Sequence, residues 1–169
     1  MAQVEINKNI HLSEHFTLGE MCITSAKTQD GNVPSHVHIE NLKRLCGWLE
    51  MLRSEWNKRY GEGNDPIIIN SGYRSPAVNK SVGGAPTSNH LTGCAVDIRT
   101  NGMEQAIEYA AILIAYAKES NQDYDELLIE RNRYGAVWLH FAVRPKDRSA
   151  TQGDACLSKN RRKVAFIIV

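Results

Sequence analysis

Three side chains of types that bind metals stand within or beside apolar stretches of the sequence. His90 and Asp97 lie in SNHLTGCAVDI, and His140 lies in VWLHFAV. A buried carboxylate is costly unless it is paired, hydrogen-bonded or bound to a metal. Taken singly, His140 could be a satisfied core residue and Asp97 could belong to an ion pair, because buried charges are usually paired. Arg74 and Arg99 are the candidates for that pair.

Taken together, the two histidines and the aspartate form the ligand set of a catalytic zinc site. Imidazole nitrogen and carboxylate oxygen suit Zn2+, and three such ligands leave a fourth position open for water. Water in that position is acidified and becomes a nucleophile near neutral pH. The sequence therefore predicts a Zn2+ site formed by His90, Asp97 and His140.

Two long helices and a shorter one are expected around this site. Ser35 precedes apolar residues spaced by three or four positions as far as Trp56, which predicts a long amphipathic helix with one buried face. Ser75 caps a short helix in SPAVNKSVGG, where the two glycines end it. The alanine-rich segment 103–118 predicts the second long helix.

Strands are expected mainly in the second half of the chain. Residues 66–70, PIIIN, are predicted to form a buried strand, and KVAFIIV is predicted to close the chain as another. The segment DELLIERNRYGAVWLHFAV predicts a hairpin, with two β-rich runs around a turn that contains glycine. The pattern favours one α+β domain over residues 1–169, a small antiparallel sheet with flanking helices.

Composition excludes several classes of partner. The net charge is +1 with no long run of one sign, so no nucleic acid partner is expected. No apolar run approaches the roughly 20 residues that cross a bilayer, so no membrane insertion is expected. We also expect a monomer. Four cysteines occur without a CxxC pair, so they are expected to be free thiols.

Several motifs resemble one known family. SGYRSP, VGGAPTSNHLTGCAVDI and VWLHF resemble the zinc D-Ala-D-Ala carboxypeptidase family of peptidoglycan peptidases, an M15-like family. That family carries SxHxxGxAxD and, much later, a WxH strand. The resemblance covers about residues 12–145 and points to the branch common in bacteria and their phages. It implies the small α+β fold shared with the hedgehog signalling domain.

The resemblance also implies roles for individual residues. His90, Asp97 and His140 match the zinc ligands of the family. Arg74 matches an arginine that faces the peptide substrate and its scissile carbonyl, and a fixed guanidinium can hold a carboxylate or polarise a carbonyl. A salt bridge to a carboxylate is the alternative role for Arg74. Ser88, the first residue of the motif, is expected to contact the substrate.

The general base departs from the family pattern. Many relatives carry an acid two or three residues before the second zinc histidine, where this chain has Trp138 and Val137. Glu130 is the best replacement. A three-residue hairpin loop at 133–135 would pair Glu130 with Trp138 and place Glu130 on the same face as His140. A loop of two or four residues would place it on the opposite face, so the prediction depends on register.

These residues predict a zinc metallopeptidase that hydrolyses a peptide bond in peptidoglycan stem peptides. The bond is either the terminal D-Ala-D-Ala bond, as for a carboxypeptidase, or L-Ala-D-Glu, as for an endopeptidase. The first residues, MAQVEINKNIHL, lack the pattern of a signal peptide. We therefore expect synthesis in the cytoplasm and action at the cell wall after release or export, as for a phage or prophage lysis enzyme. The alternative is a non-catalytic, zinc-containing wall-binding, phage-particle or interaction domain, which the missing acid just before His140 favours.

Overall fold

The computed structural model describes residues 7–144 and 163–169. The helices are α1 (Leu18–Met21), α2 (His36–Arg59), α3 (Pro76–Ser81) and α4 (Met103–Glu119), with a 3-10 turn, η1 (Asn89–Thr92). The strands are β1 (Ile69–Ser71), β2 (Ala95–Arg99), β3 (Glu126–Arg131), β4 (Val137–Ala142) and β5 (Lys163–Ile168). This mixture of helices and one sheet confirms the predicted α+β class.

The five strands form one sheet in the order β1-β2-β4-β3-β5. Neighbouring strands from β1 to β3 pair antiparallel, as predicted. β5 differs, because it pairs parallel to β3. Parallel neighbours need a long connection, and residues 145–162 lie between β4 and β5. The sequence predicted the closing strand but not its direction, which depends on where the long connection before it leads.

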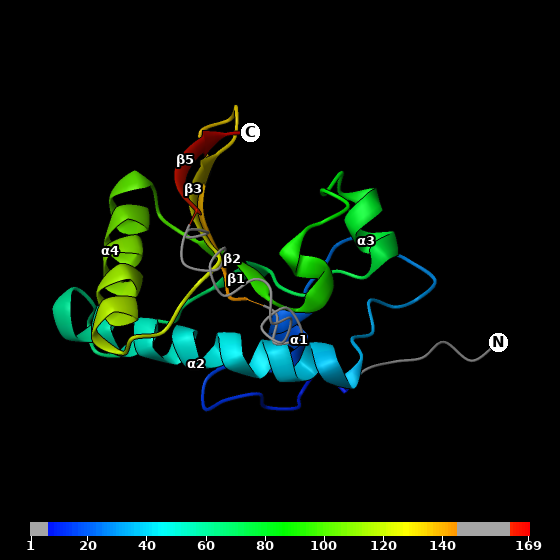
Figure 1. The fold of residues 1–169 in the computed structure, drawn as a ribbon, viewed down its shortest axis with the longest axis horizontal. Coiled ribbons are helices and arrows are strands. Elements are labelled where there is room, and N and C mark those ends of the chain that lie inside the picture. The colour runs from blue at the N-terminus through cyan, green and yellow to red at the C-terminus, as the bar shows by residue number, and fades with distance from the viewer. Residues whose placement is uncertain (1–6, 145–162) are drawn as a thin grey trace, which may run out of the picture.

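The two faces of the sheet have different neighbours. Figure 1 views the sheet nearly edge-on, with α4 on its left, α3 on its right and α2 across its lower end. Side chains alternate between the faces along each strand. Leu139 and Phe141 of β4 are buried toward the helices, and the Phe141 ring lies 5.1 Å from that of Trp48 on α2. Trp138 and His140, the intervening residues, point to the face on the α3 side.

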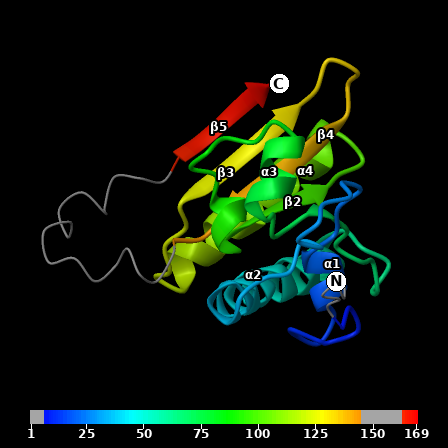
Figure 2. The same cartoon turned by 90° about the vertical axis from the view of Figure 1, so that its right-hand side faces the viewer.

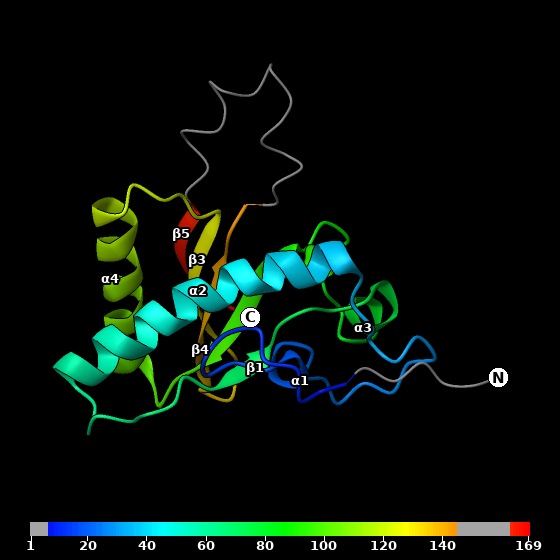
Figure 3. The ribbon, with the colours of Figure 1, turned by 90° about the horizontal axis from the view of Figure 1, so that it is seen from below.

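The long helices follow their sequence signals. Ser35 caps α2 through a side chain that accepts a hydrogen bond from the His38 backbone nitrogen. The leucines along one side of α2 are buried. Figure 3 shows α2 passing below the sheet and beside α4. α4 begins at Met103, as predicted, and ends at Glu119, one residue later than expected.

The expectation of a buried strand over residues 66–70 is wrong in extent and in burial. β1 comprises only Ile69–Ser71, and Ile68 is 42% exposed while Ile67 and Ile69 are buried. The strand begins only at Ile69, and an antiparallel sheet can pack one face against the core while its other face meets solvent. Three consecutive isoleucines therefore alternate between core and solvent.

The expected free thiols are confirmed at Cys22, Cys46 and Cys94, all of which are buried. Burial raises the pKa of the Cys22 and Cys46 thiols to about 12. The fourth cysteine, Cys156, lies outside the described residues. Within residues 7–144 and 163–169, no helix has both the length and the apolar composition needed to cross a membrane.

Candidate metal centre

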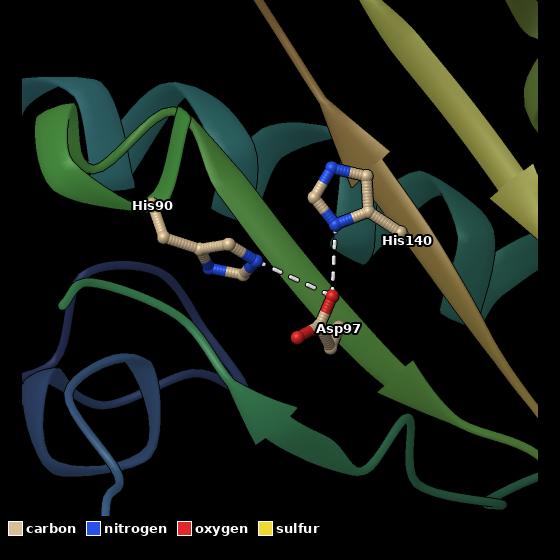
Figure 4. A group of neighbouring side chains, drawn as sticks. All are labelled: His90, Asp97 and His140. Atoms are coloured by element: carbon tan, nitrogen blue, oxygen red, sulfur yellow. Dashed lines mark hydrogen bonds and ion pairs between the residues drawn. The ribbon is translucent and has the colours of Figure 1, made fainter. Parts of the chain in front are cut away.

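His90, Asp97 and His140 come together on the α3 side of the sheet. Asp97 on β2 is paired directly with His140 on β4, so their side chains leave the same face as cross-strand neighbours. His90 reaches them from η1, which precedes β2. One potential ligand atom from each residue lies within 4.8 Å of the others. Figure 4 shows both imidazole rings directed at the Asp97 carboxylate.

One carboxylate oxygen is the point of convergence. Asp97 Oδ1 lies 2.8 Å from His140 Nδ1 and 3.3 Å from His90 Nε2. All three residues are buried, with His90 only 2% exposed. The second oxygen of Asp97 faces away from the histidines and accepts a hydrogen bond of 2.7 Å from Arg74 Nη2. Oδ1 is therefore the oxygen available to a metal.

The contact on the far side of His90 determines which of its nitrogens can bind a metal. His90 Nδ1 lies 2.6 Å from the carbonyl oxygen of Gly72. A carbonyl can only accept, so Nδ1 must carry the proton and donate it. The lone pair of the neutral ring is then on Nε2, which points at Asp97 Oδ1. An electron pair directed at a carboxylate oxygen needs a cation between them, which can be a proton or a metal ion.

The electrostatics of the cluster also favour a positive charge at this point. Burial opposes ionisation of Asp97, but the two histidines hold the pKa of its carboxyl well below the usual range. Burial likewise lowers the pKa of His140, but hydrogen bonds to Asp97 and Glu126 outweigh it and raise that pKa to about 9. The buried group thus stabilises a cation, as a metal site must. Two imidazole nitrogens and one carboxylate oxygen fit a zinc ion with an open position, the cofactor that the sequence predicts.

The SGYRSP segment holds the site through its backbone. A Cβ atom on Gly72 would lie 2.2 Å from the carbonyl oxygen of Met21, so this close approach requires glycine. The approach places the Gly72 carbonyl where His90 can donate to it. The next turn is fastened to η1, because the Arg74 backbone nitrogen donates to the His90 carbonyl at 3.1 Å.

The glycine between His90 and Asp97 ends η1 and lets β2 begin. Gly93 has φ of +72°, in the left-handed region that favours glycine. A Cβ atom there would also lie 2.7 Å from the carbonyl oxygen of His38 on α2. Gly93 therefore satisfies two constraints, the turn out of η1 and the close packing of that turn on α2.

A cleft of about 510 Å³ opens over His90, Asp97 and His140. Its walls are formed by β2, β3 and β4 on one side and by the segment from α3 to η1 on the other, which Figure 2 shows in front of the sheet. The lining includes all six residues to which the sequence assigns a role, Arg74, Ser88, His90, Asp97, Glu130 and His140. Residues far apart in the chain thus meet in one open site.

The sequence model of the peptidase M15 family matches residues 14–129 of this chain, well over half of its length. The chain belongs to the peptidase M15 family. A 40-residue stretch is 45% identical to the zinc D-Ala-D-Ala carboxypeptidase of Streptomyces albus G, covering 24% of this chain and 16% of that relative. The chain therefore spans only a small part of that relative's length. Membership of the family confirms the resemblance seen in the motifs.

The family match ends before β4, so geometry alone connects the last ligand to the others. Residues 14–129 include His90 and Asp97 but not Glu130 or His140. The direct pairing of Asp97 with His140 supplies the missing connection.

The predicted hairpin register is confirmed. Glu130 pairs with Trp138, Leu128 pairs with His140, and the Asn132 backbone nitrogen donates to the Ala136 carbonyl at 3.0 Å. Gly135 closes the three-residue loop with φ of +89°. The side chain of Glu130 lines the cleft, and its Oε2 accepts a hydrogen bond of 2.5 Å from Trp138 Nε1. Glu130 therefore lies in the cleft on the same face as His140, while the role of Glu130 as the base stays a prediction.

Arg74 adopts the ion pair that was the alternative to a substrate contact. Its Nη2 donates to Asp97 Oδ2 at 2.7 Å and its Nε donates to Ser71 Oγ at 2.8 Å. Arg99, the other candidate partner of Asp97, donates instead to Asn70 Oδ1. The Arg74 side chain also lines the cleft, so it is within the site where a substrate would bind. Its contact with substrate stays a prediction.

Ser88 has a structural role that the motif alone does not reveal. Its hydroxyl accepts a hydrogen bond of 3.3 Å from the His90 backbone nitrogen and so caps η1. Ser88 also lines the cleft, and its predicted contact with substrate is open to test.

Glu126 is the residue near the metal ligands that sequence reasoning missed. Its Oε2 lies 3.2 Å from His140 Nε2, and it lines the same cleft. A signal was present, because the register that selects Glu130 selects Glu126 equally. The two glutamates lie two positions to either side of Leu128, which faces His140 across the ladder.

Proposed function

We propose that this protein is a zinc peptidase that hydrolyses a peptide bond in peptidoglycan stem peptides. The observation that carries the proposal is the convergence of His90 Nε2, Asp97 Oδ1 and His140 Nδ1 at the floor of an open cleft. Family membership supports peptidase activity, and the substrate named for the Streptomyces relative supports a peptidoglycan peptide.

His90, Asp97 and His140 would hold the zinc, each through the atom that faces the other two. A zinc ion in such a site supplies a Lewis acid and lowers the pKa of a coordinated water. Glu130 would take the proton of the attacking water and later pass it to the leaving amine. The hydrogen bond from Trp138 Nε1 orients the Glu130 carboxylate for this transfer.

Arg74 would stabilise negative charge that develops on the scissile carbonyl oxygen. A guanidinium has five N–H donors, and the bonds to Asp97 and Ser71 use two of them. A donor held in this way needs little reorganisation when the charge develops, which is what makes such stabilisation effective. Ser88 lies in the wall beside His90 and would contact the peptide.

The test is digestion of purified peptidoglycan with the zinc-loaded protein, followed by mass spectrometry of the fragments. Release of free alanine from stem pentapeptides would identify a D-Ala-D-Ala carboxypeptidase. Stem peptides cut between L-Ala and D-Glu would identify an endopeptidase. Intact stem peptides after prolonged digestion would contradict the proposal and support the non-catalytic alternative.

The biological setting that we propose is cell-wall lysis by a phage or prophage. Co-expression with a pore-forming partner in a bacterial host would test it. Lysis should require both proteins, and it should fail when His140 is replaced by alanine. Lysis that is unchanged by that replacement would contradict this setting.

A further inference from the structure

The outer atoms of the metal ligands follow a common pattern. His90 Nδ1 donates to the Gly72 carbonyl, and Asp97 Oδ2 accepts from Arg74. His140 Nε2 completes the pattern, because it lies 3.2 Å from Glu126 Oε2. A ligand histidine whose second nitrogen is held by a carboxylate has a fixed tautomer and a more basic donor atom.

Glu126 is well placed to hold His140. It begins β3, pairs with Ala142 and lies on the cleft face, with its side chain 27% exposed. The same Oε2 atom also accepts a hydrogen bond of 3.2 Å from Asn89 Nδ2. Asn89 is the neighbour of His90 in η1, so one carboxylate links the elements that carry both histidines.

We propose that Glu126 is a positioning residue for the metal site, distinct from the base Glu130. It accepts the Nε2 proton of His140, which leaves the Nδ1 lone pair directed toward Asp97 Oδ1. Through Asn89 it also holds η1, and hence His90, at a constant distance from β4. This inference rests on the proposed zinc site but not on the proposed peptidase activity.

The two glutamates of β3 that line the cleft therefore have different roles. Glu126 is hydrogen-bonded to the proposed ligand His140, whereas Glu130 accepts a hydrogen bond from the indole of Trp138. A carboxylate that holds a ligand affects how tightly the metal binds. A carboxylate that accepts a proton from water affects the rate of hydrolysis and leaves metal affinity unchanged.

Zinc affinity is the first test, measured by competition with a chromophoric chelator and without any substrate. Glu126→Ala should weaken zinc binding by about 10- to 100-fold, the usual effect of losing such a partner. Glu126→Gln should weaken it less, because an amide oxygen can still accept the Nε2 proton but carries no charge. Glu119→Ala, a change at an exposed glutamate at the end of α4, is the control and should have no effect. Circular dichroism would verify that each variant is folded.

The tautomer of His140 is the second test, read from ¹⁵N NMR of the zinc-loaded protein. The wild type should carry the ring proton on Nε2, protected from exchange by Glu126, and Glu126→Ala should lose that protection. A proton on Nδ1 would overturn the proposal, as would a Glu126→Ala variant whose zinc affinity is within about twofold of the control. Failure to digest peptidoglycan would refute the proposed function alone, because neither measurement involves substrate.

Discussion

Replacing Glu130 by glutamine removes its ability to accept a proton but keeps the size of the side chain and its hydrogen bond to Trp138. The amide oxygen of glutamine can still accept the hydrogen bond of Trp138 Nε1, now 2.5 Å long, so the side chain should keep its place in the cleft. Only the capacity to take a proton is lost. A positioned acid-base group contributes at least about 100-fold to kcat, or about 2.7 kcal/mol of transition-state stabilisation. We therefore expect kcat for stem-peptide hydrolysis to fall by at least about that factor.

The assay combines the rate of peptide release, followed by mass spectrometry, with zinc content measured on the same sample. Zinc should stay at about one ion per chain in Glu130→Gln, because three ligands and a water complete one site. Trp138→Phe is the matched variant, since it keeps the carboxylate and removes the donor that orients it. Its kcat should fall less, by about tenfold, as expected for a hydrogen bond to a charged group. A Glu130→Gln enzyme whose kcat stays within about threefold of the wild type would refute the assignment of the base.

Three further predictions concern the metal and stability. His90→Ala, Asp97→Ala and His140→Ala should each lose most of the zinc, measured by elemental analysis, and full occupancy in any of them would exclude that residue as a ligand. Gly72→Ala should lower the free energy of unfolding by about 2 kcal/mol, because the new Cβ would lie 2.2 Å from a backbone oxygen, whereas Gly47→Ala, with open space around it in α2, should not destabilise. Burial raises the pKa of Glu50, but hydrogen bonds from Ser13 and His15 outweigh it and hold that pKa below its ordinary value of 4.5. Its contribution is therefore complete above pH 4.5 and is lost as the pH falls further, so denaturant titrations should show Glu50→Gln about 1 kcal/mol less stable at pH 7, with the gap shrinking toward pH 3.

The sequence by itself determined the two long helices and the register of one hairpin. Ser35 and the leucine stripe after it were sufficient to place α2, because capping and helical periodicity are properties of neighbouring residues. The register of the hairpin was likewise set by residues that are close in sequence. A loop that ends in Gly135 has few favoured lengths, and the three-residue choice placed Glu130 on the face of His140. The proposed zinc ligands could be named because two histidines and an aspartate have the chemistry of a zinc ligand set and match the motifs of the peptidase family.

Only the tertiary structure decided which residues surround those ligands. The pairing of Asp97 with His140 joins β2 to β4 across more than forty residues of chain, and no local pattern specifies which strands become neighbours. The partners of the outer ligand atoms, Gly72 and Glu126, depend on the same long-range packing. So does the exposure of Ile68, which lies between two buried isoleucines. Hydrogen bonds between distant segments are selected by the whole core, because each segment must bury its own apolar face before its polar groups can meet.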